Sequence, residues 1–321
     1  MVELGYTLSS EEHPPTDLVD HAVRAEDVGF DFVSISDHFH PWISAQGHSP
    51  FVWSTLGGVA RATDDVDVGV GVTCPIVRVH PAILAQAVAT VTAMFEDAGQ
   101  QFYLGVGTGE NLNEHVLGDH WPTHAVRLDM LEEAVAVMRK LWSGEMVSHH
   151  GDHFTVENAK LFTTPEEDPP VCVSAYGDKT ATRAADFGEG FWSVGPQDVV
   201  ETYESESGEG PKFSQLTVCY ADSEDEAVET AHERWPNSLL PGQLASELET
   251  HRLFEQATQL VEKEDVREAD SILTDPDPET HVETIREFVA AGYDHVYVHQ
   301  IGPDQASLFE FYEDEVLPAL D

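Results

Sequence analysis

The segment Ser34-Ile-Ser-Asp-His-Phe-His-Pro-Trp42 begins inside a short apolar run, residues 30–35, that is typical of a buried strand. Its polar part therefore lies where a parallel strand ends and a loop begins, which is where α/β barrels carry their chemistry. Asp37, His38 and Trp42 supply a hydrogen-bond acceptor, a base that titrates near neutral pH and a flat surface on which a ring can pack. The alternative is a structural role, with Asp37 capping a turn and His38 hydrogen-bonded at the strand end.

Apolar runs and helical patterns alternate along the rest of the chain. Eight strands that alternate with helices are typical of an α/β protein whose parallel sheet closes into a (β/α)8 TIM barrel. We therefore predict this fold, with polar loops at the C-terminal mouth of the barrel. The predicted strands are residues 2–8, 30–35, 67–74, 101–107, 170–175, 190–194, 215–221 and 294–299, and the predicted helices are residues 14–29, 51–62, 81–96, 128–142, 180–187, 279–291 and 304–317.

Two segments interrupt this alternation. Residues 145–168 are polar and contain scattered aromatic residues, which predicts a short hairpin. The acidic segment 223–270 is helical by composition, is broken by Pro236 and Pro241, and is expected to overlie the mouth of the barrel. No linker marks a domain boundary, so we expect a single domain over residues 1–321 with a helical insertion at about 223–270.

Acidic residues outnumber basic ones by 60 to 15, which gives the chain a formal net charge of −45. Such a charge drives unfolding by self-repulsion in dilute buffer, whereas the Debye length falls to about 3 Å at about 1 M salt. We therefore expect a halophile's cytoplasmic protein that loses structure in low salt. Phosphate binding needs clustered Lys and Arg, so the charge also argues against nucleic acid or an anionic membrane as a partner.

Neither a membrane segment nor a cysteine motif is indicated. No apolar run reaches about 18 residues, and the first residues pass directly into a predicted strand, so we expect a soluble protein that is not exported. The cysteines Cys74, Cys172 and Cys219 lack the paired spacing of a zinc motif or a disulfide framework. They are expected in the core.

The stretch Gly105-Val-Gly-Thr-Gly-Glu110 invites a dinucleotide-binding interpretation, which one position argues against. The Rossmann pattern needs a third glycine where this chain has Glu110, and a carboxylate there would repel a pyrophosphate. We interpret the glycines instead as a loop whose backbone lies close to a ligand, with Glu110 and Asn113 facing that ligand. The alternative is that Glu110 only caps the turn that follows.

A second loop, Ala175-Tyr-Gly-Asp-Lys179, follows a predicted strand and precedes a helix. Helix N-termini after such loops bind phosphate without a local positive side chain, which matters in a chain so poor in lysine. A metal centre is the competing use of the histidines, with His38 and His40, or the group at 149–153, as candidates. The first pair lies beyond the strand end and the second in the polar insertion, so we predict no metal.

Three stretches closely resemble one family: Ser36-Asp-His-Phe-His-Pro-Trp42, the glycine-rich segment 105–113, and Leu141-Trp-Ser-Gly144. They are similar to the glucose-6-phosphate dehydrogenase branch of the coenzyme F420-dependent oxidoreductases, within the bacterial luciferase-like superfamily. The resemblance implies a (β/α)8 barrel, usually dimeric, with the deazaflavin across the C-terminal mouth. It also implies hydride transfer between the CH–OH group of an alcohol or sugar and C5 of the deazaflavin.

The resemblance assigns roles to four side chains. Asp37 would contact the deazaflavin, and His38 would take the hydroxyl proton as the substrate's carbinol carbon gives up hydride. Trp42 would hold the ring. Negative charge grows at N1 of the deazaflavin as hydride arrives, and a protonated Glu110 would donate a hydrogen bond there.

The loops after other strands are also implied as cofactor contacts. Family members carry a cis non-prolyl peptide bond behind the ring, which would fall at Gly71-Val72. Cys74 stands where a threonine is usual and keeps a small polarisable contact. The remaining implied cofactor contacts are Thr108, Gly109, Asn113, Gly177, Lys179 and Thr180.

The chain departs from the family at the phosphate-binding positions. The sugar-phosphate members place a lysine where this chain has Pro196 and Gln197, and their arginine falls near residues 270–271 here. An acidic pocket without paired cations binds a phosphomonoester poorly. We therefore expect a neutral alcohol or a non-phosphorylated sugar rather than glucose 6-phosphate.

Two other functions stay open at this point. An FMN-dependent luciferase-like monooxygenase would consume oxygen and need a supply of reduced flavin, and the aspartate, histidine, tryptophan and glutamate set argues against it. A non-catalytic cofactor-binding barrel would serve as a sensor or storage protein, and the presence of His38 and Glu110 argues against that. The expected homodimer rests on the resemblance alone.

Overall fold

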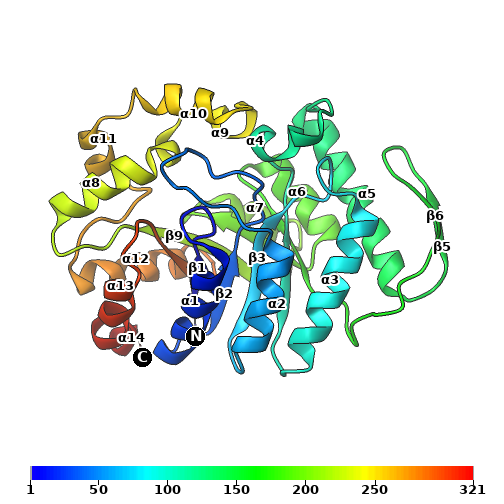
Figure 1. The fold of residues 1–321 in the computed structure, drawn as a ribbon, viewed down its shortest axis with the longest axis horizontal. Coiled ribbons are helices and arrows are strands. Elements are labelled where there is room, and N and C mark those ends of the chain that lie inside the picture. Colours follow the sequence, from blue (N-terminus) through cyan, green and yellow to red (C-terminus); the bar gives the residue numbers. More distant parts are fainter. Residues whose placement is uncertain (1, 321) are drawn as a thin grey trace.

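A closed barrel of eight parallel strands forms the centre of the protein in a computed structural model that describes residues 2–320 (Figure 1). The strands follow the order β1-β10-β9-β8-β7-β4-β3-β2, and the sheet closes because β1 pairs with both β2 and β10. The predicted (β/α)8 fold is therefore confirmed. The barrel strands are β1 (Glu3–Leu8), β2 (Phe32–Ile35), β3 (Asp67–Thr73), β4 (Phe102–Val106), β7 (Val171–Ser174), β8 (Gly190–Val194), β9 (Lys212–Val218) and β10 (His295–Gln300).

Helices surround the barrel and bury their apolar faces against the outer side of the sheet. Two short turns at the mouth, α4 (Asn111–Glu114) and η1 (His115–Leu117), follow β4. Within residues 2–320 no helix is both long and apolar enough to cross a lipid bilayer. The outer helices are α1 (Pro15–Val28), α2 (Val52–Ala62), α3 (Pro81–Glu96), α5 (His124–Trp142), α6 (Asp178–Phe187), α7 (Val199–Ser205), α12 (Pro278–Ala290) and α13 (Ala306–Phe311), which continues through the π-helical turn η3 (Tyr312–Val316) into α14 (Leu317–Leu320).

Both predicted interruptions of the alternation are confirmed. The first is an antiparallel hairpin of β5 (Val147–His150) and β6 (Thr155–Ala159), which stands out at one side of the molecule (Figure 1). The second is a helical excursion between β9 and α12 that lies at the same end of the barrel as α4, with α9 beside α4 (Figure 1). Its elements are α8 (Glu224–Arg234), η2 (Pro236–Leu239), α9 (Leu244–Glu247), α10 (His251–Thr258) and α11 (Lys263–Glu268).

The glycines of β3 make room for one large side chain inside the barrel. A Cβ atom at Gly69 would stand 2.8 Å from the indole of Trp192, and one at Gly71 would stand 2.5 Å from it. The indole stacks on Phe213 with ring centroids 4.2 Å apart, and its N–H donates to the hydroxyl of Tyr297 at 2.6 Å. The alternation of valine and glycine therefore places Val68 and Val70 against the helices and leaves the interior to Trp192.

Three predictions about the elements were wrong in detail. Helix α7 was missed because it has only seven residues and is acidic, although it buries Val199, Val200 and Tyr203. Strand β9 begins and ends three residues before the predicted range 215–221. The helical spacing of residues 279–291 predicts that Val282, Ile285 and Val289 share one buried face, but on α12 Phe288 is buried and Val289 is exposed.

Candidate active site

The carboxyl ends of the barrel strands bring most of the predicted site residues to one end of the molecule. Parallel strands end on the same rim, so loops that are distant in sequence meet there. The rim positions are Glu11 after β1, Asp37, His38 and Trp42 after β2, Cys74 after β3, Thr108, Gly109 and Glu110 after β4, and Gly177 after β7.

A buried ion pair holds His38. Its Nδ1 lies 2.7 Å from Oε1 of Glu11, which also accepts a hydrogen bond from Oγ of Ser36 at 2.6 Å. Burial alone would raise the pKa of Glu11, but the charge and hydrogen bond of His38 outweigh it and lower that pKa to about 2. Burial alone would lower the pKa of His38, but Glu11 and then Glu110 raise it. Because Nδ1 contacts Glu11, Nε2 is the nitrogen left to take a proton from a ligand.

Trp42 forms the aromatic wall beside His38. The two rings meet edge to face with centroids 5.1 Å apart, and the indole also packs against Phe254 of α10 at 5.4 Å. The backbone N–H of Trp42 donates to Oε1 of Gln46 at 2.8 Å. The indole is therefore fixed by residues of two separate segments, with part of its surface left exposed.

Asp37 lies in a second buried charge network. Its Oδ2 accepts from the hydroxyl of Thr73 at 2.5 Å, and its Oδ1 lies 3.0 Å from the guanidinium of Arg78. The backbone N–H of Arg78 donates to Glu114 at 2.8 Å, and its Nε lies 3.5 Å from the same carboxyl group. Burial raises the pKa of Glu114 to about 7, although Arg78 acts in the opposite direction. Arg78 is thus engaged by two carboxyl groups and by the backbone carbonyl of Asp37.

Asn113 connects the loops after β2 and β4. Its Oδ1 accepts from the backbone N–H groups of Phe39 at 3.0 Å and His40 at 2.9 Å. Its Nδ2 is buried and has no hydrogen-bond partner among residues 2–320. A buried donor without a partner is costly, so this amide is available to a bound ligand.

The loops after β3 and β4 pack closely against each other. The Gly71–Val72 peptide bond is cis, as the resemblance implied, and lies where the pairing of β3 with β4 shifts register. Gly109 has a φ of 72°, and a Cβ atom there would stand 3.3 Å from Cys74. Burial raises the pKa of the Cys74 thiol well above its ordinary value, so the thiol is neutral and lines the loop as a small contact.

The N-terminus of α6 offers an anion-binding position. Gly177 is the N-cap and has no side chain to satisfy the first backbone N–H groups, although its carbonyl accepts from the N–H of Thr180 at 3.0 Å. A Cβ atom at Gly177 would meet no other atom within 4 Å, so the space in front of this backbone is open. With Lys179 in the first turn, the helix N-terminus can hold a phosphate group.

Three charged residues of this site have no role in the prediction from the sequence. Glu11 belongs to a Ser-Ser-Glu-Glu turn directly after β1, and its strand-end position was the available signal. Arg78 is one of only 15 basic residues and lies in the loop after β3, which was a weaker signal. Glu114 had none, because it is one carboxylate among 60 acidic residues.

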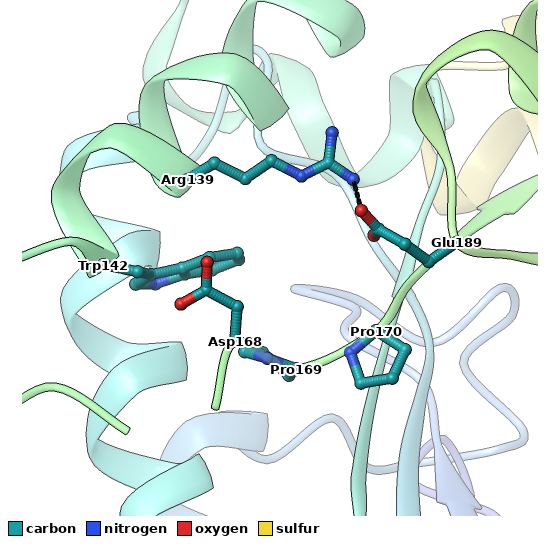
Figure 2. A pocket seen from close by; sticks show the side chains of 6 residues that line it. All are labelled: Arg139, Trp142, Asp168, Pro169, Pro170 and Glu189. Carbon is teal, nitrogen blue, oxygen red and sulfur yellow. Dashed lines mark hydrogen bonds and ion pairs between the residues drawn. The ribbon is translucent and has the colours of Figure 1, made fainter. Parts of the chain in front are cut away.

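A separate hollow of about 190 Å³ lies at the opposite end of the barrel (Figure 2). Its residues precede β7 and β8, and the ion pair between Arg139 and Glu189 crosses it. It contains none of the predicted site residues, so we place the candidate site at the carboxyl ends of the strands. Its lining residues are Arg139, Trp142, Asp168, Pro169, Pro170 and Glu189.

The chain belongs to the luciferase-like monooxygenase family, whose sequence model matches residues 2–295. The F420-dependent glucose-6-phosphate dehydrogenase of Intrasporangium calvum is 36% identical to it, over 100% of this chain and 99% of that protein. The enzyme of the same name from Microbacterium testaceum is 32% identical, over 99% of this chain and 97% of that protein. The family inferred from the sequence motifs is therefore confirmed.

Solved structures agree with this assignment. An F420-dependent secondary alcohol dehydrogenase in complex with an F420–acetone adduct has a TM-score of 0.90 and 31% identity, covering 100% of this chain and 99% of that chain. A coenzyme F420-dependent tetrahydromethanopterin reductase from Methanopyrus kandleri has a TM-score of 0.78 and 22% identity, covering 100% of this chain and 99% of that chain, and shares the fold.

Proposed function

We propose that this chain is a coenzyme F420-dependent oxidoreductase that transfers hydride between the CH–OH group of an alcohol or sugar and C5 of the deazaflavin. The observation that carries the proposal is the buried pair of Glu11 and His38, which presents one ring nitrogen beside Trp42 at the barrel mouth. The curated relatives named F420-dependent dehydrogenases, which match over nearly the whole chain, support the choice of cofactor.

The residues at the mouth fit a deazaflavin with an anionic tail. The unpartnered Nδ2 of Asn113 is a donor for the ring system, and the open N-terminus of α6 with Lys179 suits the phosphate of the tail. Trp42 and the Gly71–Val72 segment would hold the ring, together with Asp37, Cys74, Thr108, Gly109, Gly177 and Thr180 around it. When bound, the deazaflavin supplies C5 as the hydride acceptor or donor.

His38 is the base in this proposal. A neutral Nε2 takes the hydroxyl proton of the alcohol, and Glu11 stabilises the imidazolium that results. Because the pKa of His38 is raised, alcohol oxidation should be favoured on the alkaline side of that pKa and carbonyl reduction on the acid side. We assign to Glu110 a contact with N1 of the ring.

The charges at the mouth favour a neutral substrate. The carboxyl groups of Glu11, Asp37 and Glu114 surround the site, and Arg78 is already engaged by two of them. A phosphomonoester needs converging cations that are not committed elsewhere. We therefore propose a neutral alcohol or a non-phosphorylated sugar as substrate.

Binding of the two candidate cofactors tests the proposal. The purified protein would be titrated anaerobically, in about 2 M KCl, with coenzyme F420 and separately with FMN, and binding would be followed by fluorescence. Tight binding of F420 with weak binding of FMN, followed by loss of F420 absorbance when an alcohol or sugar is added, is the expected result. Preference for FMN, with oxygen consumption, would move the protein to the monooxygenase function that the family's name describes.

We also propose that residues 1–321 form a single domain and that two copies of the chain form a homodimer. We propose the cytoplasm of a halophile as its location. The net charge of −45 supports the need for salt, and the family resemblance supports the dimer. Light scattering coupled to size exclusion, and the number of unfolding transitions in salt, would test these proposals. A monomer or two separate transitions would contradict them.

A further inference from the structure

The helical excursion contacts the loop that carries His38 and Trp42 at several points, among them His251 with His40, whose ring centroids lie 4.7 Å apart, and Glu255, which accepts from the N–H of Ser44 at 3.4 Å. Two further contacts support Trp42. One contact is apolar and comes from α10, and the other is polar and comes from the end of α8 and from η2. Neither contact involves the groups that would take part in proton transfer. Both contacts reach Trp42, the first through its indole and the second through its backbone N–H.

The apolar contact is centred on Phe254. This side chain is completely buried, and its ring meets the indole of Trp42 at a centroid distance of 5.4 Å and an angle of 62°. Ile43, which follows Trp42, and Leu112 of α4 complete the buried cluster. Phe254 therefore fills the space behind the indole and keeps it next to His38.

The polar contact is made by Gln46, which is only 2% exposed. Its Oε1 accepts from the N–H of Trp42 at 2.8 Å, and its Nε2 donates to the carbonyl of Arg234 at 3.0 Å and to Oδ1 of Asn237 at 3.2 Å. The guanidinium of Arg234 returns a hydrogen bond to the carbonyl of Ala45 at 2.6 Å. One amide thus ties the backbone of Trp42 to the excursion.

These contacts continue to His38. The indole meets the imidazole of His38 edge to face at 5.1 Å, while Glu11 contacts Nδ1. If the indole of Trp42 moved, the imidazole of His38 would keep its ion pair with Glu11 but lose its contact with the indole. A displacement of about 1 Å at a reacting group can cost about 100-fold in rate, so such a shift would be measurable.

We propose that Phe254 and Gln46 are positioning residues, through which the helical excursion fixes Trp42 and thereby His38. The inference rests on the proposed function for its kinetic consequences. In this role the helical excursion is a structural part of the active site, and the site would not keep its geometry without it.

The first test compares Phe254→Ala with Leu253→Ala, a matched control on the same helix whose side chain is 37% exposed. With F420 and a neutral alcohol, Phe254→Ala should lower kcat about 10- to 100-fold and shift the acid limb of kcat/KM to higher pH. The direction of the shift follows because burial lowers the pKa of His38, and loss of the indole cover would reduce that burial. Unchanged kcat and an unchanged limb in Phe254→Ala would overturn the proposal.

A second variant addresses the polar contact, and also serves if Phe254→Ala does not fold. Gln46→Glu keeps an acceptor for the N–H of Trp42 but removes the donor to Arg234 and Asn237. We expect a smaller loss of kcat than in Phe254→Ala, with the same direction of the pH shift. Wild-type kinetics in this variant would show that the excursion does not act through Gln46.

A measurement on the protein alone separates this inference from the proposed function. The near-ultraviolet circular dichroism of Phe254→Ala should differ from that of the wild type, and the difference should disappear when both carry Trp42→Phe. This result would support the positioning of Trp42 even if the wild type bound no F420. A difference that survives in the Trp42→Phe background would overturn the role of Trp42.

Discussion

Replacement of Glu11 by Gln tests the buried ion pair with a side chain of the same shape. The substitution removes the charge beside Nδ1 of His38 and keeps a group that can hydrogen-bond to Ser36. The largest raising influence on the pKa of His38 is then lost, so that pKa should fall. The acid limb of kcat/KM for alcohol oxidation should therefore move to lower pH, while kcat decreases because the imidazolium is no longer stabilised.

The pKa shift of Glu11 gives the contribution of the ion pair to the free energy of folding. Its displacement from 4.5 to about 2 corresponds to about 3 kcal/mol of folding free energy, and the side chain is too buried for solvent to screen this. A lowered carboxyl pKa stabilises the folded state above about pH 4.5, and the contribution is lost as the pH falls toward about 2. The raised pKa of His38 adds stability below about pH 6.5, which is lost as the pH rises through that pKa. The pair of Glu11 and His38 should therefore stabilise the folded state most between about pH 4.5 and about pH 6.5.

Urea unfolding in about 2 M KCl, measured at several pH values, would test this magnitude. Glu11→Gln should unfold with up to about 3 kcal/mol less free energy than the wild type near pH 5.5, and the difference should narrow at more acid and more alkaline pH. Glu12→Gln, in the next position, is the control that should leave the acid limb of the rate profile in place. An unmoved limb in Glu11→Gln, or a stability difference independent of pH, would refute the reasoning.

Three further predictions concern charge. Arg78→Met leaves two buried carboxyl groups without their cation, so urea unfolding should show a loss of about 3–5 kcal/mol; a loss below 1 kcal/mol would show that the network does not depend on Arg78. Lys179→Ala should weaken binding of F420 several-fold but leave unchanged the binding of a deazaflavin nucleoside without a phosphate tail, and equal weakening of both would exclude a tail contact. Circular dichroism should show unfolding as KCl is lowered from about 2 M to about 0.05 M, and a fold that is stable at the lower concentration would contradict the screening argument.

The barrel and the position of its site could be predicted because they depend on local patterns. Residues 34–42 combine the end of an apolar strand with polar side chains. This pattern indicates the mouth of a barrel even when the order of the strands is not known. The cis peptide at Gly71–Val72 was found through the family resemblance alone, because no local propensity predicts it. Helix α7 was missed because seven residues are too few for a clear helical period.

The partners within the site were harder to predict than the site itself. Glu11 and His38 come from different strands, and their pairing depends on the adjacency of β1 and β2 in the closed sheet. Phe254 reaches Trp42 only because the excursion folds back over the barrel mouth, a contact that no periodicity encodes. The donor that Asn113 leaves unpartnered is likewise a property of the assembled loops.

Trp192 and the backbone of Val70 limit the residues that two neighbouring glycines can be replaced by. A Cβ atom at Gly71 would stand 2.5 Å from the indole, whereas one at Gly105 would stand 2.1 Å from the backbone carbonyl of Val70. Gly71 can therefore accept a larger residue only after Trp192 has become smaller, while Gly105 cannot change in either background. Any lineage or redesign that introduces a larger residue at Gly71 therefore has to replace the indole of Trp192 first.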